Sequence, residues 1–342
     1  MKHHALRLRA VIDETHDAKS LVFDVPREIA PLFAYRPGQF VTLRLPLQGR
    51  HVPRCYSMSS APLIDDALRV TVKRVANGRG SNWVCDRLKA GDVVDVLPPA
   101  GVFTPRSLDD DLLLFAGGSG ITPVYSILRS ALAGGRGRIV LVYANRDERS
   151  VIFRGELQAL AAAHPRRLQV LHWLDTVQGV PSVAQLAELA RPSRDAQAFI
   201  CGPGPFMDAA QAALQAIDMR PEAIHVERFA SLPDEDDAAA RSDTGAAGGI
   251  DHADLEITLD GTLHRIEATG RETVLDAALR AGLNVPYSCQ AGLCASCRCQ
   301  VVDGEVRLRH NEALDAKDLA RGWTLACQAV PLSPRLHIRF PE

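Results

Sequence analysis

The chain has 342 residues, 46% of them hydrophobic and 23% charged, and a formal net charge of −2. These fractions are typical of ordinary folded domains, and the length exceeds what one hydrophobic core usually supports, so we expect two or three domains. The charge argues against nucleic-acid and membrane-surface binding, because both need a clear basic excess.

The N-terminal sequence MKHHALRLRAVIDE lacks the apolar core of a signal peptide. No apolar run approaches the roughly 20 residues that a membrane-spanning helix needs. We therefore expect a cytoplasmic protein with no membrane partner. In that compartment, clustered cysteines bind metal more often than they form disulfides.

Residues 1–107 form the first predicted domain. Alternating or β-branched runs separated by Pro and Gly predict an antiparallel β-barrel or sandwich. The predicted strands are 6–12, 20–25, 39–45, 67–75 and 92–98, with one helix at about 81–88.

Residues 108–232 form the second predicted domain, in which strands alternate with helices. This order predicts an α/β domain with a parallel sheet of the nucleotide-binding type. The predicted strands are 111–117, 138–144, 168–174, 199–201 and 224–229, and the predicted helices are 122–133, 154–163, 182–190 and 205–216.

Residues 233–252 contain almost no large apolar side chain, and we expect them to be a flexible linker. Residues 253–342 form the third predicted domain. It begins with a hairpin at 254–268 that turns at Asp260-Gly261. A helix is expected at 273–282 and strands at 300–308. The helix has Thr273 and Asp276 as a capping box, and its expected buried stripe is Val274, Leu275, Ala278 and Leu279.

Four cysteines have the spacing of a plant-type [2Fe–2S] centre, namely Cys289, Cys294 and Cys297 as C-x4-C-x2-C with a distant Cys327. Gly292 lets the backbone of this loop approach the cluster closely. A zinc site on Cys294, Cys297 and Cys299 is the alternative, although the x4 gap suits it poorly. From about residue 254 the chain resembles a plant-type ferredoxin, which implies an α+β β-grasp fold.

The segments PRCYSMSS (53–60) and NGRGSNWV (77–84) resemble the flavin signature of the ferredoxin–NADP reductase superfamily. The resemblance covers residues 1 to about 232 and makes the first domain a flavin-binding β-barrel. It implies that Arg54 neutralises the flavin phosphate, that Tyr56 stacks on the isoalloxazine and that Ser57 hydrogen-bonds near N5. Gly80 and Ser81 would form a second phosphate element at a helix N-terminus, with a plain helix cap as the alternative. Cys55 and Cys85 are expected to pack as small apolar side chains.

Two further segments, AGGSGITPVY (116–125) and CGPGPFM (201–207), resemble the nicotinamide-binding loops of the same superfamily. The glycines permit close backbone approach to a dinucleotide, Thr122 can cap a helix, and Pro123 suits its first position. We see no acidic residue at the later strand end where a dinucleotide fingerprint has one. The resemblance assigns the dinucleotide to Gly117, Gly118, Gly120, Thr122, Pro123, Cys201, Gly202, Pro203 and Met207.

The resemblance also implies a reaction centre made of Ser57, Cys201 and Glu227. Cys201 would lie beside the nicotinamide, with a structural strand-end thiol as the alternative. Phe229 would cover the flavin and Glu227 would lie near the site. The alternative for these two residues is a final strand that packs on the core.

The order of the three domains resembles reductase components of multicomponent oxygenases, of the phenylacetyl-CoA epoxidase and 3-ketosteroid 9α-hydroxylase types. This implies an NAD(P)H:acceptor oxidoreductase that takes a hydride on FAD and passes single electrons through the cluster to a terminal oxygenase or hydroxylase. FAD is favoured over FMN by GRGSNW at 78–83. A redox-sensing or carrier protein with a non-catalytic flavin domain is the alternative.

The choice between NADPH and NADH stays open. Arg146, Arg149 and Arg154 lie where a 2′-phosphate could bind, which favours NADPH. Asp147 and Glu148 lie among them and weaken that preference.

Overall fold

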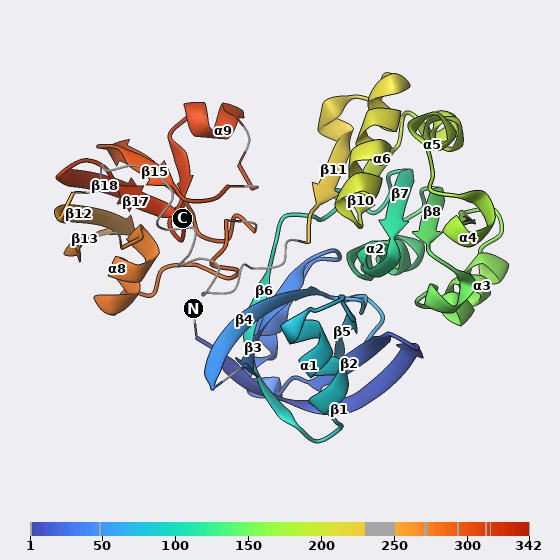
Figure 1. Ribbon diagram of the computed structural model, residues 1–342, viewed down its shortest axis with the longest axis horizontal. Helices are drawn as coiled ribbons and strands as arrows, with labels where there is room; N and C mark the ends of the chain where they lie inside the picture. The colour runs from blue at the N-terminus through green and yellow to red at the C-terminus, as the bar shows by residue number, and fades with distance from the viewer. Residues whose placement is uncertain are drawn as a thin grey trace. The chain divides into compact units, whose positions relative to one another are not determined.

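The computed structural model describes residues 2–47, 49–229, 250–269, 272–292, 294–311, 313–314 and 316–341 (Figure 1). The chain divides into two compact units, one of residues 3–229 and one of residues 230–342 with the first two residues. Residues 233–249 of the predicted linker lie outside the described residues. Residues 250–252 are described, and a strand begins at the last of them.

The first part of the larger unit is a six-stranded antiparallel sheet with the order β4-β3-β6-β1-β2-β5. Beyond the end of β4, Met58 forms a bridge to Val70 on β5, so the two edges of the sheet meet and the barrel closes. Its elements are β1 (His4–Thr15), β2 (Ala18–Asp24), η1 (Arg27–Phe33), β3 (Phe40–Leu47), β4 (Arg50–Ser57), β5 (Leu68–Lys73), α1 (Arg79–Arg87) and β6 (Val93–Ala100).

Strand β4 is absent from the sequence-based prediction, which placed residues 53–60 between strands. In the structure β4 pairs with β3 along its whole length, from Arg50 opposite Leu47 to Ser57 opposite Phe40. Most of its side chains are exposed or half-buried, and the strand therefore carries no clear apolar alternation.

The second part of the larger unit is a five-stranded parallel sheet with the order β11-β10-β7-β8-β9. Its strands are β7 (Leu112–Gly117), β8 (Ile139–Asn145), β9 (Leu168–Leu174), β10 (Gln197–Cys201) and β11 (Ile224–Glu227). Chain order reverses between β7 and its neighbour β10, so the carboxyl ends of these two strands form the switch point where such sheets bind ligands.

Helices cover both faces of the parallel sheet. Helices α2 (Ile121–Gly134) and α3 (Arg154–Ala163) pack on one face with Leu112 and Leu114, and α5 (Val183–Ala190) and α6 (Gly204–Ala216) pack on the other with Leu113 and Phe115. The central strand β7 is buried on both sides, which explains its unbroken apolar run. The shorter elements are η2 (Gly118–Gly120), η3 (Glu148–Ser150), α4 (Asp175–Gln178), η4 (Arg191–Ser193) and η5 (Pro221–Ala223).

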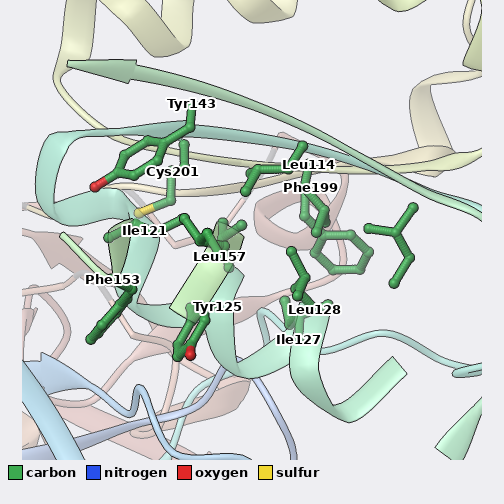
Figure 2. Packing of buried hydrophobic residues seen from close by; sticks show 14 of the residues in the cluster. Leu114, Ile121, Tyr125, Ile127, Leu128, Tyr143, Phe153, Leu157, Phe199 and Cys201 are labelled. Carbon is green, nitrogen blue, oxygen red and sulfur yellow. The ribbon is translucent and has the colours of Figure 1, made fainter. Parts of the chain in front are cut away.

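Helix α2 joins the parallel sheet to the barrel. Ser126 donates a hydrogen bond to the Ser60 carbonyl at 2.6 Å, and Arg129 forms a two-pronged ion pair with Asp65. Tyr125 stacks on Phe153 with ring centroids 4.2 Å apart (Figure 2). The Arg69 guanidinium of β5 lies 5.0 Å from the centroid of the Phe153 ring. The barrel and the parallel sheet are thus held together by buried and charged contacts.

The smaller unit has a five-stranded sheet with the order β13-β12-β18-β14-β16, in which β12 and β18 run parallel. The capping box at the start of α8 is confirmed. Its predicted stripe is correct except that Ala277 is buried and Leu279 is 38% exposed, because Leu279 lies roughly 140° around the helix from Val274. The elements are β12 (His252–Leu259), β13 (Thr262–Thr269), α8 (Val274–Arg280), β14 (Arg298–Asp303), β15 (Val306–Leu308), α9 (Ala316–Ala320), β16 (Trp323–Leu325), β17 (Ala329–Pro331) and β18 (Arg335–Arg339).

Within the described ranges, every helix is too short or too polar to cross a membrane.

Candidate functional site

The predicted flavin phosphate site lies where β4 meets the N-terminus of α1. The Arg54 side chain crosses Gly80 so closely that a Cβ there would lie 3.1 Å from the Arg54 Cγ and Nε atoms. Burial lowers the pKa of Arg54, and the nearby Arg79 cation lowers it further. A buried cation of this kind is stabilised by a bound anion.

Helix α1 begins after Gly78, which has no side chain to cap the first turn. The N–H groups of that turn are therefore suited to a phosphate, as at other helix N-termini. Ser81 accepts a hydrogen bond from the Val75 amide at 3.1 Å, which leaves its own hydroxyl proton for a further acceptor. The residues present thus fit a flavin diphosphate beside Arg54.

The next two residues of the signature also lie on β4. Tyr56 is half-buried, and burial raises the pKa of its phenol, so the ring stays neutral. Ser57 is buried at the strand end, opposite Phe40 of β3. Their contacts with the flavin ring stay predictions.

Of the two cysteines expected to pack as small apolar groups, Cys85 is buried in the barrel core and Cys55 is exposed. The prediction for Cys55 is wrong. The thiol lies 3.3 Å from the Thr42 hydroxyl, on a strand most of whose residues are exposed or half-buried.

The two glycine-rich loops meet at the switch point of the parallel sheet. A Cβ on Gly202 would lie 2.9 Å from the Gly117 Cα atom, and a Cβ on Gly120 would lie 2.1 Å from the Cys201 carbonyl oxygen. Gly202 and Gly120 are required because the two loops pack backbone against backbone, whereas a Cβ on Gly117 would lie 2.7 Å from the Pro203 Cδ atom. The sequence motif by itself indicated only a dinucleotide as the reason for them.

Gly118 differs from the other loop glycines. Its φ is +51°, and a Cβ there would meet nothing closer than the Lys73 Nζ atom at 3.9 Å. Lys73 is the last residue of β5 in the barrel, its side chain is 18% exposed, and its ammonium lies 3.7 Å from the Asp17 carboxylate. A cation beside a glycine loop suits a pyrophosphate.

Lys73 is a candidate site residue that the sequence-based prediction did not include. Its only local signal is an alternating strand, and nothing in that pattern links it to a loop far along the chain. The juxtaposition arises from the packing of the barrel on the parallel sheet.

Two details of the helix that follows the glycine loop differ from prediction. Thr122 donates a hydrogen bond to the Ser119 carbonyl at 3.0 Å and does not cap α2, because the helix starts at Ile121 after Gly120. Pro123 is consequently the third helical residue and not the first. The third position tolerates proline, since none of the first four N–H groups has a partner within the helix.

Cys201 ends β10 and is fully buried in the core cluster on the α2 face (Figure 2). Burial raises the pKa of its thiol well above the usual value, and Glu227, paired with it across β10 and β11, raises it further. The thiol therefore stays protonated. Its predicted contact with the nicotinamide stays a prediction.

The remaining residues predicted to bind the nucleotide or the flavin differ in burial. Pro203 is the N-cap of α6, and Met207 packs into the core cluster on the α5 and α6 face. Phe229 ends the larger unit with 44% of its surface exposed. No contact of Met207 or Phe229 with a cofactor follows from these positions.

Two of the three arginines considered for a 2′-phosphate form ion pairs with neighbouring carboxylates. Arg146 contacts Asp147 at 3.2 Å, and Arg154 contacts Glu148 at 2.6 Å. Arg149 makes no ion pair or hydrogen bond within the part of the chain that the structure describes. The loop thus offers one unpaired cation.

An acidic residue that the sequence-based prediction missed follows the next strand. Asp175 comes directly after β9, and its neighbour Thr176 donates a backbone hydrogen bond to the Arg146 carbonyl at 3.0 Å. Burial raises the pKa of the Asp175 carboxyl. This hydrogen bond ties the segment after β9 to the arginine loop, so Asp175 lies on a segment that contacts that loop.

The cysteine loop of the smaller unit arranges its buried thiols as two pairs. Cys294 hydrogen-bonds with Cys289, which with burial raises the pKa of Cys294. Cys297 hydrogen-bonds with Cys327, which raises the pKa of Cys297 and lowers that of Cys327. Two pairs match a binuclear centre, in which each of two irons takes two thiolates.

Backbone groups of the same loop surround the thiols. The Ala291 amide points at the Cys289 sulfur at 3.4 Å, and the Gly292 amide hydrogen-bonds with Cys327. Gly292 has a φ of +75°, and a Cβ there would lie 2.5 Å from the His310 carbonyl oxygen. The loop therefore fits an iron–sulfur cluster, whose sulfur atoms accept hydrogen bonds from amides.

A single-ion zinc site fits the geometry less well. Among the described residues, no group of three or more His, Cys, Asp or Glu side chains converges on one metal position. Cys299, on β14, is fully buried beside Cys327 and Ala326 and belongs to neither thiol pair. Cys299 is expected to stand apart from the cluster thiols, because it lies two residues beyond Cys297 on a strand whose extended geometry sets its side-chain direction.

Three parts of the chain match described domain families. Residues 5–104 match the oxidoreductase FAD-binding domain, residues 114–212 the oxidoreductase NAD-binding domain, and residues 257–332 the 2Fe-2S iron-sulfur cluster binding domain.

Relatives match over nearly the whole chain. The ferredoxin reductase component of 3-ketosteroid-9-alpha-monooxygenase from Rhodococcus rhodochrous is 52% identical, with 98% of this chain and 96% of that protein covered. A subunit of 1,2-phenylacetyl-CoA epoxidase from Escherichia coli K12 is 33% identical, with 98% and 97% covered. The structure of phthalate dioxygenase reductase shares the fold, with a TM-score of 0.62, 23% identity, and 99% and 98% covered.

Proposed function

Because the chain belongs to the family of oxygenase reductase components that carry FAD-binding, NAD-binding and 2Fe-2S domains, we propose that its partner is a 3-ketosteroid 9α-hydroxylating oxygenase. The predicted family, cofactors and electron-transfer role are confirmed by the domain matches and the relatives. The observation that carries the proposal is the much higher identity to the 3-ketosteroid reductase component than to the epoxidase subunit.

Bound FAD would supply hydride-accepting chemistry toward the reduced nicotinamide, and a bound [2Fe–2S] cluster would supply one-electron transfer. We assign the flavin diphosphate to Arg54 and the first turn of α1. Tyr56, kept neutral by burial, provides an aromatic face and not a charge. Ser57 provides a hydroxyl at the buried end of β4.

We assign the nicotinamide dinucleotide to the switch point between β7 and β10. The left-handed Gly118 presents a bare backbone, and the Lys73 ammonium beside it neutralises the pyrophosphate. Cys201 and Glu227 lie side by side on β10 and β11. Since the Cys201 thiol stays protonated, it acts as a packing and polar group and not as a nucleophile.

We assign the cluster to Cys289, Cys294, Cys297 and Cys327. A bound cluster would require these four residues as thiolates, so its binding would be coupled to release of the thiol protons. The amides of Ala291 and Gly292 then remain to stabilise the negative charge on sulfur. The zinc alternative is set aside because this segment matches a [2Fe–2S] domain.

We further propose that NADH is the preferred donor. Asp175 lies beside the arginine loop, and two of the three arginines there are already paired with carboxylates. A carboxylate accepts hydrogen bonds from a free ribose 2′-hydroxyl and repels a 2′-phosphate. This reverses the preference for NADPH that the arginines alone would give.

We place the reaction in the cytoplasm. All eight cysteines are free thiols, which a reducing compartment maintains.

The partner is tested by reconstitution. The FAD- and iron-loaded protein, NADH and a purified 3-ketosteroid 9α-oxygenase should hydroxylate a 3-ketosteroid, with product measured by mass spectrometry. Flavin bleaching by NADH without product would contradict the steroid partner. A flavin that NADH fails to bleach would instead support the sensor or carrier alternative.

A further inference from the structure

Tyr143 has a buried hydroxyl that joins two loops. It lies near the end of β8, and its side chain is fully buried on the α2 face of the parallel sheet. The hydroxyl donates a hydrogen bond to the Gly118 carbonyl at 3.1 Å and accepts one from the Ile152 amide at 3.2 Å. Figure 2 shows the phenol oxygen directed away from the packed aliphatic side chains.

The two backbone groups belong to the two loops that follow β7 and β8. Gly118 is the left-handed residue of the glycine loop, and Ile152 lies between Arg149 and Arg154 in the arginine loop (residues 146–154). Both loops leave the same edge of the sheet, because β7 and β8 run parallel. One hydroxyl therefore fixes the positions of both loops relative to each other.

The Tyr143 hydroxyl makes these two hydrogen bonds at a position that otherwise packs with apolar side chains. Tyr143 shares its face of β8 with Ile139 and Leu141, which are also buried. A phenylalanine would fill the same space, but it would leave the Gly118 carbonyl and the Ile152 amide without this partner. The Gly118 carbonyl would keep the Ile121 amide as a donor, but the buried Ile152 amide would be left unpaired, which is costly.

Burial separates this role from direct binding. With no exposed surface, the Tyr143 side chain cannot touch a dinucleotide in the loop it supports. Burial also raises the pKa of the phenol far above neutrality, so the hydroxyl keeps its proton and continues to donate.

We propose that Tyr143 is a positioning residue for the nicotinamide dinucleotide, whose hydroxyl holds the glycine loop and the arginine loop in the binding arrangement. The inference rests on the proposed assignment of the dinucleotide to the glycine loop. It predicts an effect on affinity, because the hydroxyl acts before the hydride moves and equally in ground and transition states.

The test is Tyr143→Phe in the FAD-loaded protein, with the Kd for NAD⁺ measured from the flavin spectrum and steady-state kinetics measured with NADH and ferricyanide. We expect Kd and KM to rise roughly five- to twentyfold, as for the loss of one or two buried hydrogen bonds. We expect kcat to change by less than about twofold. A Kd within twofold of wild type would overturn the proposal.

The matched control is Tyr35→Phe. Tyr35 donates its hydroxyl to Ser60 at 2.6 Å in the barrel, so this variant also loses a partly buried phenol hydrogen bond. Both variants should lose some thermal stability, but only Tyr143→Phe should weaken NAD⁺ binding. An equal rise in Kd in both variants would show a general structural effect and contradict the positioning role.

A double-mutant cycle separates the proposal from its premise. Gly118→Ala has room for its Cβ but strains the left-handed backbone, so it should weaken NAD⁺ binding by itself. If Tyr143 acts through the Gly118 peptide, the two effects on Kd will not add. Additive effects refute the role of Tyr143. Wild-type affinity in Gly118→Ala refutes the glycine-loop assignment itself.

A measurement on the wild type needs no variant. Hydrogen exchange of the Ile152 amide in the FAD-loaded protein should be slow, because a buried tyrosine holds it. Rapid exchange of that amide would contradict the proposal even if Tyr143→Phe failed to fold.

Discussion

Arg54 combines a positive charge with burial against the backbone of α1, and this combination predicts its role. In Arg54→Ala, FAD should bind about 1.5–3 kcal/mol more weakly, or roughly ten- to hundredfold in Kd, because a charge-assisted contact with the flavin diphosphate is lost. Fluorescence of released flavin measures this. Arg9→Ala removes an exposed cation of the same barrel and should leave the Kd unchanged. Equal flavin retention in both variants would remove Arg54 from the site.

Cys294 and Cys299 offer a matched pair of buried thiols. Cys294→Ser should lower bound iron and sulfide and abolish reduction of cytochrome c, whereas NADH should still bleach the flavin. Cys299→Ser should retain iron, because Cys299 belongs to neither thiol pair. Iron assays and visible spectra of both variants check this. Iron loss in Cys299→Ser with retention in Cys294→Ser would reverse the ligand assignment.

The proposed preference for NADH over NADPH depends on Asp175. Asp175→Ser removes the carboxylate beside the arginine loop, so NADPH should gain on NADH by about tenfold in the ratio of kcat/KM values. Asp195→Ser changes an exposed carboxylate near the amino ends of the parallel strands, away from the proposed dinucleotide site, and serves as the control. An unchanged ratio in Asp175→Ser would show that Asp175 does not set the preference for NADH, and the preference expected from the arginines would stand.

At the scale of elements, the capping box of α8 gives a local stability prediction. Thr273→Ala removes the hydroxyl that accepts a hydrogen bond from the Asp276 amide. The substitution should destabilise the smaller unit by about 1 kcal/mol. Loss of cluster absorbance on heating reports that unit. Thr262→Ala, on an exposed position of β13, should shift the midpoint far less. Equal shifts would mean that the cap adds nothing.

Most elements follow from sequence patterns, and the exceptions have physical causes. Strand β9 and helix α3 have the predicted bounds. The strands β16, β17 and β18 and the helix α9 were missed. The helix and all three strands are only three to five residues long, which leaves little periodicity to detect.

The candidate sites divide in the same way. Short motifs located Arg54, the glycine loops and three of the cysteines, because the residues of each motif lie close together in sequence, and the known spacing pattern of the [2Fe–2S] centre added the distant Cys327. Lys73, Asp175 and Tyr143 were missed as site residues. Each reaches its place through pairing or packing between distant segments, and no local pattern records that.

For the whole molecule, the division into two compact units predicts two unfolding transitions. Flavin release should report the unit of residues 3–229, and loss of cluster circular dichroism the other unit. Thr273→Ala should move only the second transition. Calorimetry with both optical signals checks this. A single transition that shifts as one in the variant would show that the two units unfold together.

The seam between the barrel and the parallel sheet limits how relatives could be recombined. The Arg129–Asp65 pair, the Arg69 contact with Phe153 and the approach of Lys73 to Gly118 each take one partner from either side. A chimaera that joins the barrel of one relative to the parallel-sheet part of another near residue 105 would combine contact residues that come from two different proteins. Shuffling experiments should therefore exchange residues 3–229 as a single cassette.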